Sequence, residues 1–262
     1  MNNLSKPMLK SKIIGLVIIV LTLGILFKFL LLKGTTKKLL AKCNSQQVCK
    51  NQSVVVLHGL VRSSASMNKV SQALNESGYT VCNIQYPSRK HSISELATDF
   101  VYPEIQQCLD NLEQPIDFVT HSLGGIIVRQ LAQSTDIKIN RVVMLSPPNH
   151  GSELVDKLKI LPLFGLINGQ AGLSLGTEAN SIPNTLAEVT FETGIIVGNK
   201  SYNPVYSYLI PGADDGKVAV SSAKVARMKD FLVVPHSHSF MMNSDAVIKQ
   251  TLGFLENGNF AR

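Results

Sequence analysis

The chain has 262 residues, enough for one α/β domain or two small domains. Its composition, with 45% hydrophobic and 16% charged residues and 18 glycines, excludes a disordered, a collagen-like and a disulfide-framework protein. The formal charge is +7, but residues 1–42 hold eight lysines and no acidic residue. The rest of the chain has 17 basic and 18 acidic side chains. Nothing therefore predicts the basic face that a nucleic-acid-binding domain needs, and we expect no nucleic-acid partner.

The N-terminus predicts a membrane anchor. Residues 13–32 read IIGLVIIVLTLGILFKFLLL, with Lys28 as the one charge, and a membrane-spanning helix needs about 20 apolar residues. The alternative is a cleaved signal peptide, because lysines precede this stretch. The stretch is longer than the usual core of a signal peptide, however, and no clear small-residue cleavage site follows. Since lysines flank both ends, the side of the membrane stays open, with a periplasmic or exported domain expected.

The four cysteines are compatible with an exported, oxidised domain. Cys43 and Cys49 enclose a short polar stretch, which makes a local disulfide plausible. The alternative is four thiols, with Cys82 buried in a strand and Cys108 on a helix. No Cys/His cluster and no HExxH motif is present in the sequence, so we expect no metal and no cofactor.

After the anchor, short runs rich in Val and Ile alternate with amphipathic stretches. The runs predict six buried strands at Ser53–Leu57, Tyr79–Ile84, Asp117–Thr120, Arg141–Leu145, Gly194–Val197 and Phe231–Val234. The stretches predict helices at Ser66–Ser77, Ser92–Leu112, Leu123–Gln133 and Ala246–Leu255. This alternation indicates a mostly parallel sheet of about six strands flanked by helices. We expect one α/β domain over residues 43–262, preceded by the anchor and its basic flanks at 1–42.

Residues 152–187 interrupt the alternation. This stretch contains four glycines and two prolines among scattered apolar residues. It is interpreted either as a lid or cap over a site, or as the ordinary packing of an irregular connection.

The sharpest local signal lies at residues 118–125, which read FVTHSLGG. An apolar strand runs into Ser122, and small residues follow before a helix, as in a nucleophile elbow. The N–H of Leu123 would then face the oxyanion that forms when the serine attacks a carbonyl. Thr120 replaces the first glycine of the usual G-x-S-x-G pattern. The alternative is a helix start without chemistry.

Two downstream segments supply a carboxylate and an imidazole. Asp214 and Asp215 precede Gly216, and the Asp-Gly-x-Val pattern favours Asp215, although an ordinary turn would look the same. His236 and His238 follow the last predicted strand, and we favour His238 as the base that takes the proton of the serine.

These motifs together resemble the α/β-hydrolases of the bacterial lipase/esterase type, over roughly residues 53–260. The resemblance is carried by HGL at 58–60, THSLGG at 120–125, PPNHGS at 147–152, DGKV at 215–218 and HSFMM at 238–242. It implies a Ser122–Asp215–His238 triad for ester hydrolysis without a thioester, and an oxyanion hole made by the N–H groups of Leu60 and Leu123. His58 is a poor base, because this fold orders its triad as serine, acid and histidine. His121 is expected to pack or to meet solvent.

The anchor and the apolar 152–187 stretch favour a lipophilic acyl ester as substrate. An acyltransferase and a peptidase would use the same triad, so they stay open. A non-catalytic, membrane-anchored binding protein on the same fold is a further alternative. The oligomeric state is not predicted.

Overall fold

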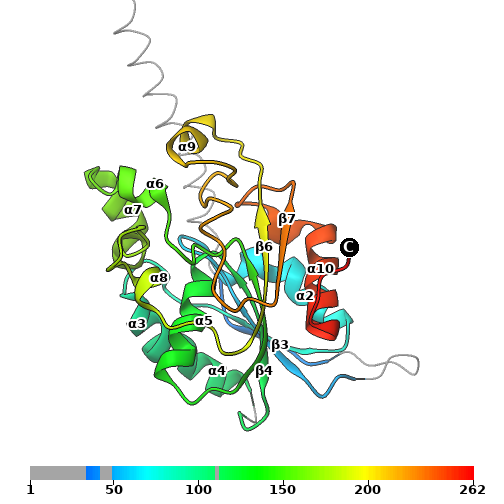
Figure 1. The fold of residues 1–262 in the computed structure, drawn as a ribbon. Coiled ribbons are helices and arrows are strands. Elements are labelled where there is room, and N and C mark those ends of the chain that lie inside the picture. The colour runs from blue at the N-terminus through cyan, green and yellow to red at the C-terminus, as the bar shows by residue number, and fades with distance from the viewer. Residues whose placement is uncertain (1–33, 42–48, 110–111) are drawn as a thin grey trace, which may run out of the picture. The chain divides into compact units, whose positions relative to one another are not determined.

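Runs of β-branched residues form the central sheet, because such side chains pack well when both faces are covered. The computed structural model describes residues 34–41, 49–109 and 112–262. Its sheet has the strand order β1-β3-β2-β4-β5-β6-β7 (Figure 1). The strands are β1 (Lys37–Leu39), β2 (Ser53–Leu57), β3 (Thr80–Ile84), β4 (Ile116–His121), β5 (Ile139–Leu145), β6 (Glu192–Gly198) and β7 (Asp230–Val234).

Strands β2 to β7 run parallel, which confirms the six predicted strands to within two residues at each end. The sheet has seven strands rather than about six, because β1 pairs antiparallel with β3. Strand β1 was not predicted, because it has only three residues and lies within the basic flank of the predicted anchor. Residues 34–262 form one compact unit.

Helices cover both faces of the sheet (Figure 1). On one face, the core includes residues of α3 (Ile93–Glu95), the π-helical turn η2 (Leu96–Val101), α4 (Tyr102–Cys108) and α5 (Leu123–Ser134). On the other face, it includes residues of α2 (Asn68–Glu76) and α10 (Asp245–Asn257), with the short 3-10 turns η1 (Ser64–Met67) and η3 (Met241–Asn243) nearby. This is the two-layer covering that a parallel sheet requires.

The 152–187 stretch is helical where the sequence predicted only an excursion. It forms α6 (Glu153–Leu158), α7 (Pro162–Leu173) and α8 (Ile182–Thr185), and α9 (Pro204–Leu209) follows between β6 and β7. The buried guanidinium of Arg129, on α5, donates hydrogen bonds to the carbonyl oxygens of Pro183, Leu186 and Ala187 at 3.1–3.4 Å. The end of this stretch is thereby fastened to α5.

Cys82 in β3 and Cys108 in α4 form a disulfide across 26 residues, which corrects the interpretation of both as thiols. Cys49 is disulfide-bonded as well. The predicted pairing with Cys43 involves a position outside the described residues, as does the anchor at 13–32. Among the helices of residues 34–41, 49–109 and 112–262, none is long and apolar enough to cross a membrane.

Candidate active site

Ser122 occupies a sharp turn between the end of β4 and the start of α5. Its φ is 52° and its ψ is −119°, a backbone conformation that side-chain-bearing residues rarely adopt. The turn is held by a hydrogen bond from the Ser122 N–H to the Leu145 carbonyl at 2.9 Å. A Cβ at position 124 would lie 2.8 Å from the Leu57 carbonyl oxygen, so only glycine fits there. This is the geometry expected of the nucleophile elbow.

The loop after β2 lies against this turn. A Cβ on Gly59 would lie 3.1 Å from Cβ of Ser122 and 2.8 Å from Nδ1 of His121, so the two segments touch. Leu60 follows in this loop, and Leu123 is the first residue of α5, where backbone N–H groups have no partner within the helix. The two predicted oxyanion donors therefore belong to segments that meet at Ser122.

The carboxylate of Asp215 and the ring of His238 are in direct contact. Nδ1 of His238 lies 2.8 Å from Oδ2 of Asp215, and both side chains are buried. The other carboxylate oxygen, Oδ1, accepts hydrogen bonds from the N–H groups of Lys217 at 3.0 Å and Val218 at 2.8 Å. The His238 N–H also donates to the Asp215 carbonyl at 2.9 Å, which fixes the two loops against each other.

The alternative acid and base are engaged elsewhere. Oδ1 of Asp214 accepts hydrogen bonds from the Ser207 hydroxyl and the Gly216 N–H, so it closes the turn and holds α9. Nε2 of His236 lies 3.0 Å from the Ser244 hydroxyl at the start of α10. Asp215 and His238, the residues favoured from the sequence over Asp214 and His236, are the two that contact each other.

Burial favours the neutral form of the His238 imidazole, while the groups around Asp215 favour its ionised form. Burial lowers the pKa of His238 below its ordinary value, and the carboxylate of Asp215 offsets this only in part. Burial alone would raise the pKa of Asp215, but the facing His238 and hydrogen bonds from Ser146 and Val218 bring that pKa below its ordinary value. A neutral histidine beside a carboxylate is the resting state of a general base.

Two further residues hold the segment of His238, and the sequence did not reveal either role. His121 was expected to pack or to meet solvent; it packs, and its buried Nε2 lies 2.9 Å from the His238 carbonyl. Arg62 donates a hydrogen bond to the Ser239 carbonyl at 2.8 Å. His121 and His238 are 117 positions apart in the sequence, which hides this contact from any local pattern.

His58 stacks on Tyr86, with ring centroids 4.1 Å apart. Burial lowers the pKa of His58 to about 4, so this ring stays neutral at physiological pH. Its hydrogen-bonding partners are backbone groups of Gly59 and Tyr86. His58 shapes the loop after β2, which agrees with its rejection as the base.

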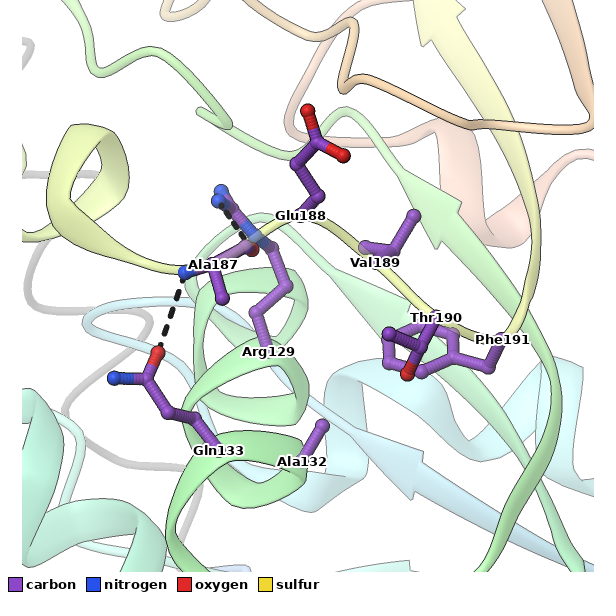
Figure 2. A pocket seen from close by; sticks show the side chains of 8 residues that line it. All are labelled: Arg129, Ala132, Gln133, Ala187, Glu188, Val189, Thr190 and Phe191. Atoms are coloured by element: carbon purple, nitrogen blue, oxygen red, sulfur yellow. Dashed lines mark hydrogen bonds between the residues drawn. The ribbon is translucent and has the colours of Figure 1, made fainter.

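A separate pocket lies beside the second half of α5, where that helix faces the segment leading into β6 (Figure 2). It is lined by Arg129, Ala132, Gln133, Ala187, Glu188, Val189, Thr190 and Phe191. Its volume of about 100 Å³ is small beside the roughly 300–1,000 Å³ of ligand pockets. None of the elbow, carboxylate or imidazole residues lines it.

The parallel sheet, the strained serine turn and the buried acid–histidine pair define an α/β-hydrolase. A protein-family model described as palmitoyl protein thioesterase matches residues 53–193, which is more than half of the chain. The chain therefore belongs to the palmitoyl protein thioesterase family, among the lipase-, esterase- and thioesterase-like hydrolases of this fold.

Curated and solved relatives agree with this class. The chain is 26% identical over 140 residues to a triacylglycerol lipase of Pseudomonas fragi, covering 51% of this chain and 47% of the lipase. The match thus spans about half of that relative's length. The mature Bacillus licheniformis lipase BlEst2 superposes with a TM-score of 0.63 at 19% identity, over 86% of this chain and 97% of the lipase. The Legionella pneumophila phospholipase PlaB gives 0.57 at 18% identity, over 71% of this chain and 52% of PlaB. At these identities the solved structures show the shared fold.

Proposed function

We propose that this chain is a serine hydrolase that cleaves carboxylic esters of lipophilic acyl groups through an acyl-enzyme. The contact that carries the proposal is the 2.8 Å hydrogen bond between His238 and Asp215. The His238 carbonyl in turn contacts the ring of His121, the residue directly before Ser122. Lipid esters as substrates are supported by the family match and by the lipase relative.

In the proposed reaction, Oγ of Ser122 attacks the carbonyl carbon of the ester while Nε2 of His238 takes the hydroxyl proton. Asp215 holds Nδ1–H and so directs Nε2 toward the serine. The backbone N–H groups of Leu60 and Leu123 stabilise the negative oxygen of the tetrahedral intermediate. Collapse breaks the bond to the alcohol, which leaves with the proton from His238. Water then attacks the acyl-enzyme by the same proton path and releases the carboxylic acid.

Labelling by a fluorophosphonate tests this proposal. Wild type should be labelled, and Ser122→Ala should lose both the label and the hydrolysis of p-nitrophenyl esters. Ser134→Ala, which changes an exposed serine at the other end of α5, is the matched control and should keep both. Labelling that persists in Ser122→Ala would remove the proposed nucleophile.

A thioesterase activity on the same triad is the second candidate, because the matching family model is described as a palmitoyl protein thioesterase. The two activities share the acyl-enzyme and differ in the leaving group, a thiol instead of an alcohol. Rates with an oxyester and a thioester of the same acyl chain compare them directly. Adding an alcohol as a competing acceptor separates hydrolysis from acyl transfer.

We also propose that residues 13–32 anchor the chain and that the domain is periplasmic or exported. The Cys82–Cys108 disulfide supports an oxidising compartment. A reporter fused after residue 262, active on one side of the membrane only, tests the orientation.

A further inference from the structure

Exposed apolar side chains gather at the edge of the sheet that carries Ser122. We call the apolar rim the following six exposed residues: Ile160, Leu161, Leu163, Leu166, Tyr208 and Phe240. Leu166 is 73% and Tyr208 90% exposed. Single exposed apolar residues are ordinary, but four within seven positions of one corner are not.

The rim residues belong to segments that leave the sheet at the carboxyl ends of its parallel strands, which is the edge that carries Ser122. The corner between α6 and α7 comes after β5, α9 comes after β6, and Phe240 comes after β7. Figure 1 shows α6, α7 and α9 along the edge toward which β6 points. A Cβ on Gly172 of α7 would lie 2.9 Å from the Leu60 side chain, so α7 also covers the proposed oxyanion loop.

The chain enters the domain at this same edge. Because β1 is antiparallel, its first residue, Lys37, lies opposite Asn83 near the carboxyl end of β3. The two preceding residues are fixed there: the Ser64 hydroxyl donates to the Thr35 carbonyl at 2.9 Å, and the Gln85 N–H donates to the Thr36 hydroxyl at 3.0 Å. The predicted anchor ends at residue 32, directly before this segment.

One loop joins this entry segment to the rim. Gln85 binds Thr36, and four residues later the Arg89 guanidinium donates to the Leu166 carbonyl at 2.9 Å. A Cβ on Gly169 would lie 1.8 Å from the Arg89 carbonyl oxygen, so α7 rests directly on the loop. The entry segment and the exposed face of α7 are therefore held in a fixed relation.

From this geometry we propose that the apolar rim docks on the bilayer that holds the anchor, so that the site opens toward the membrane. An anchor leaving the bilayer at residue 32 has only a few residues, at no more than about 3.6 Å each, before the chain is fixed at the site edge. The exposed Lys37 beside it suits anionic headgroups. The inference rests on the proposed anchor, and it deepens the proposed ester hydrolysis by naming the membrane as the source of the acyl substrate.

Single-tryptophan fluorescence tests the docking without any turnover, since the chain has no tryptophan. Full-length Leu166→Trp and Leu163→Trp are placed in phosphatidylglycerol-containing vesicles whose acyl chains are brominated. Leu40→Trp is the matched control, because Leu40 is 67% exposed but lies past the opposite end of β1. A docked rim inserts about 5–10 Å into the interface, so the two rim variants should lose about half of their emission while the control keeps its own.

Several outcomes would overturn the docking. The first is that the chain does not float with the vesicles. The second is that the rim variants emit as strongly in brominated as in unbrominated lipid. The third is that the rim variants and the control are quenched to the same extent. Quenching by the brominated lipid distinguishes docking on the bilayer from association of two copies, because a rim covered by a second copy of the chain would not be quenched. Fluorophosphonate labelling of the same samples reports separately on Ser122, so failure of the hydrolase proposal is distinguishable.

A second variant pair links docking to substrate. In Leu163→Glu/Leu166→Glu, charges on the rim should lower the ratio of turnover of a vesicle-borne ester to that of a water-soluble ester by about tenfold or more. Leu40→Glu should leave this ratio as in wild type. A ratio that is the same in all three proteins contradicts the proposal.

Discussion

Two adjacent aspartates differ in what their side chains touch. Asp215 binds the ring of His238, whereas Asp214 binds the Ser207 hydroxyl and the N–H of Gly216. Asp215→Asn keeps the shape but removes the charge and can favour the wrong tautomer of His238. We expect kcat to fall by about 10⁴-fold, as for the comparable change in other triads. Steady-state kinetics with a p-nitrophenyl ester measures this fall.

Asp214→Asn is the matched control for this change. It keeps Oδ1 as an acceptor for Ser207 and Gly216, so the turn should persist with most of the activity. Equal losses in the two variants would show that the turn, and not the carboxylate at His238, limits the reaction.

The ionisation of His238 should set the pH dependence of kcat/KM. A general base works only when neutral, and burial places the pKa of His238 below its ordinary value of 6.5. We therefore expect kcat/KM to rise with pH through a midpoint below 6.5, with activity lost as the pH falls through it. The nearby charge of Arg62 contributes to this lowering. Arg62→Gln should therefore move the midpoint to higher pH.

His236→Gln is the control for this profile. His236 binds Ser244 and not Asp215, so the midpoint should stay in place. A wild-type midpoint above 6.5, or a midpoint that follows His236, would contradict the assignment of the base.

At the scale of elements, α7 depends on one glycine. Gly169 breaks the helix with a φ of 65°, and a Cβ there would lie 1.8 Å from the Arg89 carbonyl oxygen. Gly169→Ala must therefore push α7 away from the loop after β3 and adopt a strained backbone. We expect the free energy of unfolding to fall by about 1–3 kcal/mol, measured by chemical denaturation.

Gly165 supplies the comparison within the same helix. A Cβ at Gly165 would meet Leu173 at an ordinary 3.6 Å, and its φ is not positive. Gly165→Ala should be neutral or stabilising by about 0.5–1 kcal/mol, because alanine suits a helix better than glycine. If both variants behave alike, the contact with Arg89 does not fix α7.

The elements that the sequence revealed are those with a strong local pattern. Six strands were readable because Val- and Ile-rich runs are long enough to be buried on both faces. Strand β1 was missed, since three residues pairing along one edge carry no periodicity. The helices within 152–187 were also missed, because α7 is apolar on both its exposed and its packed faces.

At the scale of the whole molecule, the contact between Asp215 and His238 was predictable from the sequence, and the contacts that support the proposed site were not. Ser122, Asp215 and His238 each follow a strand in a recognisable local motif, and parallel strands bring their carboxyl ends to one edge. The contacts of His121 and Arg62 with the segment of His238 depend on three-dimensional packing between distant segments. The same holds for the Cys82–Cys108 disulfide, whose spacing matches no motif.

That disulfide joins the sheet to the helical layer, so its effect extends to the unfolding of the whole domain. Closing a 26-residue loop restricts the unfolded chain and should stabilise the fold by about 3 kcal/mol. We expect Cys82→Ala/Cys108→Ala to lower the Tm by about 10 °C, measured by circular dichroism. Reductant should then lower the Tm of the variant less than that of wild type, because only the disulfide of Cys49 is left to break. An unchanged Tm in the double variant would mean that packing between β3 and α4 holds these layers together without the covalent link.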